Sequence, residues 1–152
     1  MKHKRIIKQA ECLNLSAKFK LTYHIAIDEK DAIMLRVSVN EGGGYFSPEW
    51  VLLDTIFKKL AEAKKPLTSN SLHGIFEGKS SNTPGFVFAI LYAEGLVERD
   101  IDNPRVYIAC DSTAIVDEYK KLITSGVDIK INPLPEGRKT ASKTVPTKKQ
   151  PS

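Results

Sequence analysis

The sequence has few of the residues that build disulfide, metal and membrane sites. Only two cysteines, Cys12 and Cys110, occur in 152 residues, which excludes a dense disulfide framework and favours a reducing cytoplasm. No apolar run approaches the roughly 18 residues that a membrane-spanning helix requires, and no signal-like apolar core follows the first residues. The composition therefore predicts a cytoplasmic protein with no membrane partner.

Catalytic and metal-binding groups are also sparse. The three histidines, His3, His24 and His73, stand far apart, and no His or Cys pair has zinc-ligand spacing. No serine lies in a Gly-x-Ser-x-Gly elbow. The adjacent acids Asp117 and Glu118 lie beside Lys120 and Lys121, as on a solvated helix face. We therefore expect a non-enzymatic protein without a metal ion or another cofactor.

Positive charge is concentrated at the two ends of the chain. The formal net charge is +5, from 23 Lys and Arg against 18 Asp and Glu. Residues 1–10 and residues 134–152 each have a net charge of +4, which leaves −3 for residues 11–133. We expect a basic leader at residues 1–18. Residues 134–152, with three prolines and few apolar side chains, are expected to form a disordered basic tail that holds phosphates weakly or only aids solubility.

Residues 19–40 alternate between apolar and polar side chains, which predicts two paired strands with one buried face. A three-residue loop, Glu29-Lys30-Asp31, would join them and set their register. The expected core-facing pairs are Ile27–Ile33, Ile25–Leu35 and Tyr23–Val37, and the pairs on the other face are His24–Arg36 and Thr22–Ser38. A lone hairpin is marginal in water, so this one must pack on the rest of the domain or on a second subunit.

The pattern after the hairpin predicts helices separated by short strands. Gly42-Gly43-Gly44 supplies a hinge, and Ser47-Pro48-Glu49 has the hydroxyl, proline and acid of a helix start. That helix would run to about Lys64 with a core stripe of Trp50, Leu53, Phe57 and Leu60. Further elements are expected at 71–77 (short helix), 82–94 (helix, closed by Gly95), 96–100 and 105–110 (strands), 112–125 (helix, closed by Gly126) and 127–131 (strand).

The order helix, short helix, helix, strand, turn, strand over residues 48–110 resembles the winged helix-turn-helix superfamily. The most characteristic stretch is Tyr92–Arg99, YAEGLVER, in which Gly95 would end the third helix before the first wing strand. Pro66-Leu67-Thr68 stands where these domains place a short strand. The expected fold class is therefore α+β, with a winged helix-turn-helix core in one domain at residues 19–133, an N-terminal β-hairpin and a C-terminal helix.

The resemblance implies that the third helix lies in the DNA major groove and that the wing touches the backbone or the minor groove. The helix positions that would face DNA cannot donate hydrogen bonds from their side chains; they are Phe86, Ala89, Ile90 and Ala93. This helix is apolar on every side, so the hairpin or another subunit covers it, or it is a docking surface for a partner protein. The polar candidates for DNA contacts are Ser69, Asn70, His73, Lys79, Ser80, Ser81, Asn82, Thr83, Asn103 and Arg105.

Structural roles compete with these assignments. Helix capping is the more common role for the Ser and Asn residues, and Arg99 and Arg105 could pair with Glu98, Asp100 or Asp102. The first functional hypothesis is a DNA-associated regulatory or accessory protein that binds double-stranded DNA mainly through phosphates, as a homodimer. The second is a protein-interaction module for oligomerisation or as an adaptor, which uses the apolar third helix. The first is favoured by analogy, because DNA binding is the commoner use of this scaffold.

Overall fold

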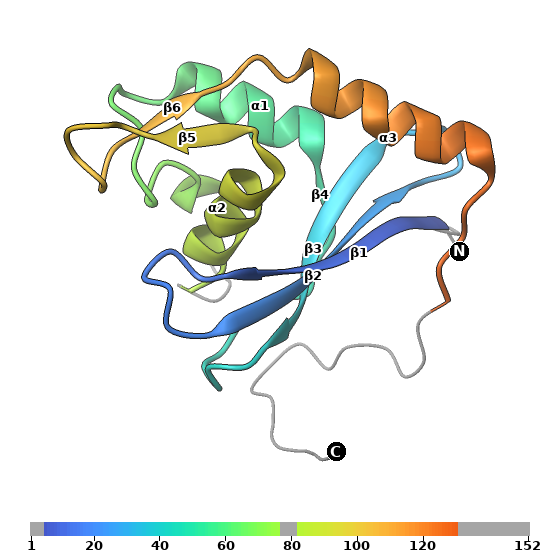
Figure 1. The fold of residues 1–152 in the computed structure, drawn as a ribbon, viewed down its shortest axis with the longest axis horizontal. Helices are drawn as coiled ribbons and strands as arrows, with labels where there is room; N and C mark the ends of the chain where they lie inside the picture. Colours follow the sequence, from blue (N-terminus) through green and yellow to red (C-terminus); the bar gives the residue numbers. More distant parts are fainter. Residues whose placement is uncertain (1–4, 77–81, 131–152) are drawn as a thin grey trace.

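The arrangement of the chain is given by a computed structural model that describes residues 5–76 and 82–130 (Figure 1). Within this part, a four-stranded antiparallel sheet has the order β1-β2-β3-β4, and β5 and β6 form a second, two-stranded sheet. The α+β class expected from the sequence is confirmed. The elements are β1 Arg5–Leu13, β2 Lys20–Ile27, β3 Ile33–Asn40, β4 Val51–Leu52, α1 Leu53–Glu62, the 3₁₀ helix η1 His73–Phe76, α2 Thr83–Glu94, β5 Val97–Arg99, β6 Tyr107–Ala109 and α3 Thr113–Ser125.

The register of the β2–β3 hairpin follows the sequence prediction at four pairs: Tyr23–Val37, His24–Arg36, Ile25–Leu35 and Ile27–Ile33. The loop closes because Asp31 adopts a positive φ of 63° and the Asp28 carboxylate accepts the N–H groups of Lys30 and Ala32. The expected Thr22–Ser38 pair is wrong. A β-bulge between Thr22 and Tyr23 places Thr22 opposite Val39.

The basic leader predicted at residues 1–18 is wrong for residues 5–13, which form a strand of the sheet. Residues 5–13 form β1, an edge strand paired with β2, so the sheet includes residues that precede the expected domain start at residue 19. Two of the basic side chains there make contacts within the fold. The Arg5 guanidinium donates to the carbonyl oxygen of Ile123 at 2.6 Å, and Lys8 forms an ion pair with Glu94. Local charge suggested only a basic leader, because the partners of these residues lie far along the chain.

The first helix starts later than the Ser47-Pro48 signal predicts. Val51 and Leu52 pair with Leu35 and Met34 as β4, and α1 begins only at Leu53. Pairing with the sheet therefore overrides the local helix-start signal. The buried stripe of α1 is Leu53, Ile56 and Leu60, whereas Phe57 is half-buried and Trp50 precedes the helix.

The other elements lie close to their predicted positions. α2 ends at Gly95 and α3 at Gly126, and both glycines adopt the left-handed conformation with φ of 85° and 82°. The predicted short helix is the 3₁₀ helix η1, and the two strands expected at 96–100 and 105–110 are present but shorter. The strand expected at 127–131 is wrong for residues 127–130, where a single backbone hydrogen bond joins the Ile129 N–H to Ile6.

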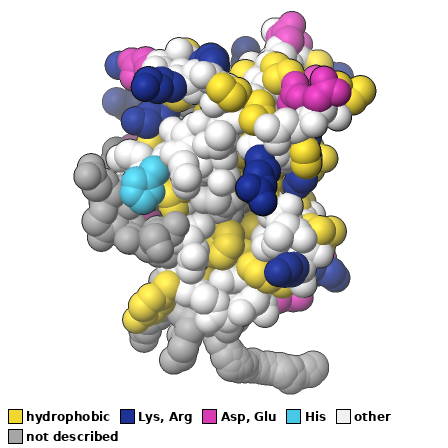
Figure 2. Space-filling view, turned by 90° about the vertical axis from the view of Figure 1, so that its left-hand side faces the viewer, with side chains coloured by type: hydrophobic (Ala, Val, Ile, Leu, Met, Phe, Trp, Pro, Cys, Tyr) yellow, Lys and Arg dark blue, Asp and Glu magenta, His cyan; other side chains and the backbone are white. Residues whose placement is uncertain are grey.

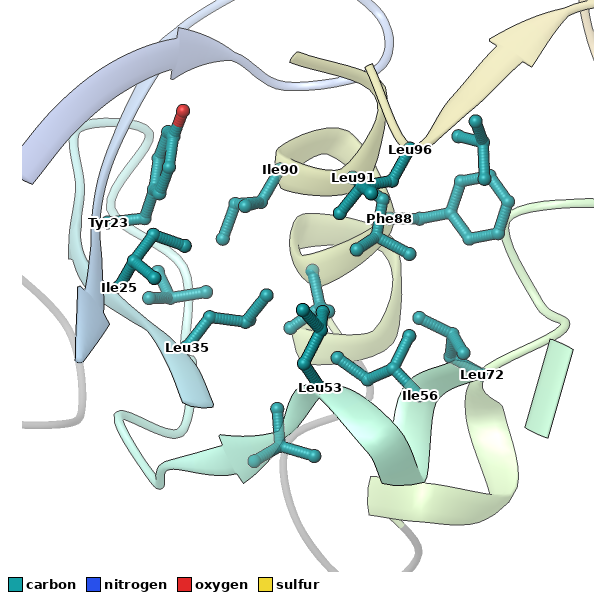
Figure 3. Packing of buried hydrophobic residues seen from close by; sticks show 14 of the residues in the cluster. Tyr23, Ile25, Leu35, Leu53, Ile56, Leu72, Phe88, Ile90, Leu91 and Leu96 are labelled. Carbon is teal, nitrogen blue, oxygen red and sulfur yellow. The ribbon is translucent and has the colours of Figure 1, made fainter. Parts of the chain in front are cut away.

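Helix α2 is the centre of the hydrophobic core. It lies between the four-stranded sheet on one side and α1, η1 and the β5–β6 sheet on the other (Figure 1). Figure 3 shows Ile90 directed toward Tyr23 and Ile25 of β2. Val87, Phe88, Ala89, Ile90 and Leu91 are each at most 1% exposed. Of the alternatives open from the sequence, it is the chain's own sheet that covers this apolar helix.

Candidate functional site

Three segments with predicted DNA-contact residues lie on the same side of the molecule, at the left in Figure 1. They are the turn 68–73 that leads into η1, the start of α2, and the loop between β5 and β6, called the wing below and comprising residues 100–106. Figure 2 looks directly at this side. The candidates Lys79, Ser80 and Ser81 lie outside the described residues.

The candidates before and at the start of α2 differ in accessibility. Asn70 and His73 are exposed, and Ser69 is half-buried. Asn82 is exposed, but its side-chain amide donates to the Tyr45 carbonyl at 3.0 Å. Thr83 is only 1% exposed, and its hydroxyl oxygen accepts the Ser47 N–H. Thr83 is therefore a structural residue and is not available to DNA.

The wing is shaped by Asp100 and Asn103. The Asp100 carboxylate accepts the N–H groups of Asp102 and Asn103 at 3.0 Å each, and the Asn103 side chain accepts the Arg105 N–H at 3.1 Å. These bonds hold the turn and leave Asn103 and Arg105 exposed. Among residues 5–76 and 82–130, no carboxylate forms an ion pair with Arg105.

Arg99 differs from Arg105 because it is part of the fold. Its guanidinium donates to the Leu15 carbonyl at 2.7 Å and lies 4.9 Å from the ring centre of Tyr92 and 5.6 Å from that of Tyr107. It thereby ties β5 to the turn after β1. The expected pairing of Arg99 or Arg105 with Glu98, Asp100 or Asp102 is not found in the described part of the chain.

The charge on this side is mixed. The described residues contain 15 Lys and Arg and 16 Asp and Glu, a net charge of −1. Figure 2 shows Lys and Arg in separate groups, with acidic and hydrophobic side chains between them. Any attraction to a polyanion through this face would therefore depend on individual cations and not on a continuous positive stripe.

The residues predicted to bind a partner protein through α2 do not form a common surface. Ala89 and Ile90 are buried in the fold, whereas Ala93 is exposed. Phe86 is half-buried because the Phe19 ring packs edge-on against it, with ring centres 6.0 Å apart. Ala89 and Ile90 are therefore enclosed by the fold and cannot contact a partner, whereas a docking role for Phe86 and Ala93 stays a prediction.

A buried cluster around Glu94 escaped the sequence analysis. The Glu94 side chain is 3% exposed and accepts hydrogen bonds from the Tyr23 and Tyr119 hydroxyls, the latter at 2.5 Å. The Lys8 ammonium lies 2.8 Å from the Oε2 atom of Glu94. The cluster joins α2 to β1, β2 and α3. One signal was available, because Glu94 is the only charged residue in an otherwise apolar helix.

The chemistry of this cluster is that of a structural contact. Burial and the Glu94 carboxylate raise the pKa of both tyrosines above the ordinary value, and burial beside Glu94 raises the pKa of the Cys12 thiol to about 11. These groups therefore stay protonated at neutral pH. Two shallow depressions, one of about 410 Å³ beside β6 and one on α3, do not border Glu94. We assign the cluster to stability.

No family model, no curated protein and no solved structure matches the chain. Within residues 5–76 and 82–130, no three His, Cys, Asp or Glu side chains are grouped as metal ligands would be. No helix in that part of the chain has the length and apolar character needed to cross a membrane.

Proposed function

We propose that this chain is a non-enzymatic winged-helix protein that associates with double-stranded DNA through phosphate contacts of its wing and neighbouring turns. The winged-helix interpretation is supported by the order α1, η1, α2, β5, β6 and by an isolated antiparallel bridge between Leu67 and Tyr107. That bridge places Leu67 beside β6 of the two-stranded sheet, at the position that Pro66-Leu67-Thr68 suggested.

The observation that carries the DNA proposal is the placement of exposed polar groups on one side. Arg105 and Asn103 of the wing, Asn70 before η1 and His73 at the start of η1 are all exposed, and these segments lie on one side of the molecule (Figure 1). Arg105 has no ion pair with a described carboxylate, so its positive charge is available to a phosphate.

The buried position of α2 determines the kind of binding. A helix that is enclosed by the protein's own sheet cannot read base edges in the major groove. The proposal is therefore sequence-independent association, for which dissociation constants of about 10⁻⁴–10⁻⁶ M are usual at physiological salt. The basic residues 134–152 would add affinity by the same counterion-release mechanism.

The test is a binding titration with a fluorescein-labelled duplex, followed by anisotropy between about 50 and 200 mM salt. Binding should weaken steeply with salt. Arg105→Gln should weaken binding and reduce the salt slope by about 0.9, the value for one phosphate contact. The matched control is Lys30→Gln, which removes one exposed positive charge from the β2–β3 turn, away from the wing (Figure 1).

A truncation separates the folded domain from the tail. Removing residues 134–152 should weaken binding but leave the effect of Arg105→Gln in place. If the truncated chain no longer binds duplex, the tail and not the wing is the DNA contact. Removing residues 1–10 is unsuitable as a test, because residues 5–10 belong to β1.

A second candidate function, association with another copy of the chain, is favoured by apolar side chains on the wing side. Ile101 is 95% exposed and Ile108 is 49% exposed. Such contact would use the wing sheet and not α2. Sedimentation velocity should then show a concentration-dependent dimer that Ile101→Ser weakens, and a monomer at every concentration contradicts this candidate.

A further inference from the structure

The outer face of the four-stranded sheet, turned away from α2, holds a second cluster of polar and aromatic side chains. Tyr23, Ile25 and Leu35 point to the core, so the alternating residues of β2 and β3 point outward. There His24 and Arg36 meet Gln9 of β1 and Trp50 from the segment before β4. Ile6, Ala26 and Met34 form the apolar floor around them.

The Arg36 guanidinium is held by His24 at its Nε edge and by the Trp50 ring at one face. Its Nε donates to Nδ1 of His24 at 3.2 Å. Because that nitrogen accepts, the His24 ring holds its hydrogen on Nε2, which donates to the Gln9 side-chain oxygen at 2.9 Å. The guanidinium carbon lies 4.3 Å from the ring centre of Trp50, in a cation–π contact.

The two terminal amino groups of Arg36 take no part in the contacts with His24 and Trp50. They form no hydrogen bond or ion pair with any residue that the structure describes. His24 adds no positive charge beside Arg36, since burial and the nearby Arg36 lower the pKa of its ring to about 4 and keep it neutral. Arg36 is thus a half-buried cation whose open edge presents two parallel N–H donors.

We propose that Arg36 is the centre of an oxyanion-binding site, in which its two terminal amino groups bind a phosphate or carboxylate group in bidentate fashion. The planar fork of arginine matches two oxygens of such a group, and charge-assisted bonds of this kind are about twice as strong as neutral ones. His24 and Trp50 position the fork. The site lies across the sheet from α2 and the wing, so it is separate from the proposed DNA contact (Figure 1).

Trp50 is the only tryptophan of the chain and therefore reports on this site directly. The experiment titrates the full-length protein with sodium phosphate and, separately, sodium acetate, with chloride holding the ionic strength constant. Trp50 emission should change in a saturable way with at least one of the two anions. The anion bound more tightly identifies the ligand as a phosphate or a carboxylate.

Two substitutions test the role of the fork. Arg36→Gln should abolish the titration, and Arg36→Lys, which keeps the charge but loses the fork, should weaken binding by about tenfold. Lys30→Gln, remote from the cluster, should bind as the wild type does. Circular dichroism establishes that each variant is folded, and Arg36→Lys decides the outcome if Arg36→Gln is not. The proposal is overturned if neither anion changes wild-type emission, or if Arg36→Lys binds as tightly as the wild type.

Discussion

Replacing Glu94 by Gln should destabilise the fold more than any other isosteric change of a polar residue in the described chain. The Glu94 carboxylate accepts from Tyr23 and Tyr119 and pairs with Lys8 at 2.8 Å. Hydrogen bonds to a charged group contribute about 1.5–3 kcal/mol each, and removing one partner of a buried ion pair costs about 3–5 kcal/mol.

The expected loss of stability in Glu94→Gln is smaller than the sum of these contributions for two reasons. The Gln amide oxygen still accepts one hydroxyl, and the Lys8 side chain is 38% exposed, so water replaces part of the lost ion pair. We expect a loss of about 3 kcal/mol, a large part of the roughly 5–15 kcal/mol that stabilises a domain. Urea unfolding followed by circular dichroism measures this change in the free energy of unfolding.

The matched control is Glu118→Gln, which removes an exposed carboxylate 3.7 Å from Lys121 and should change stability by no more than about 0.5 kcal/mol. Tyr119→Phe removes one donor from the buried cluster and should cost about 1–2 kcal/mol. In the double variant Glu94→Gln/Tyr119→Phe, the two losses should be less than additive. A Glu94→Gln variant as stable as Glu118→Gln would refute the assignment of this cluster to stability.

Two further predictions concern backbone and pH. Gly95→Ala should lower the free energy of unfolding by about 1–2 kcal/mol, because φ is +85° and the new Cβ would lie 3.4 Å from Ile115. Gly85→Ala within α2 should raise it by about 0.5–1 kcal/mol. Thermal melts in which the two variants do not shift in opposite directions contradict this prediction. The pKa of His24, about 4 when folded against the ordinary 6.5, means that the unfolded chain binds the extra proton. Stability should therefore fall by up to about 3 kcal/mol between pH 6.5 and pH 4, and His24→Gln should remove that part of the urea-derived pH profile.

Local patterns were sufficient for the parts of the fold that local interactions determine. Alternation and a three-residue loop fixed the core-facing register of β2 and β3, and a glycine in the left-handed conformation ends both α2 and α3. The exception in the hairpin, the bulge at Thr22, shifts the register by one residue without any change in the apolar pattern. Periodicity therefore predicted the elements but not this irregularity.

Features that depend on distant partners were not predictable. β1 contains polar residues that suggested a leader, yet Arg5 and Lys8 find their partners in α3 and α2. The Glu94 cluster draws its members from four elements, so no spacing in the sequence brings them together. Likewise, the hairpin register paired His24 with Arg36, but the cation–π contact requires Trp50, which lies outside the hairpin.

The most direct test of the proposed function locates the DNA contact residue by residue. Titrating ¹⁵N-labelled protein with a short duplex and recording amide NMR spectra should shift the signals of Asn70, His73, Asn103 and Arg105. The amides of residues 87–91 in α2 should remain unchanged, because that helix is enclosed by the sheet. Shifts confined to residues 134–152, or no shifts at all, would contradict the account of the wing as the DNA-binding element.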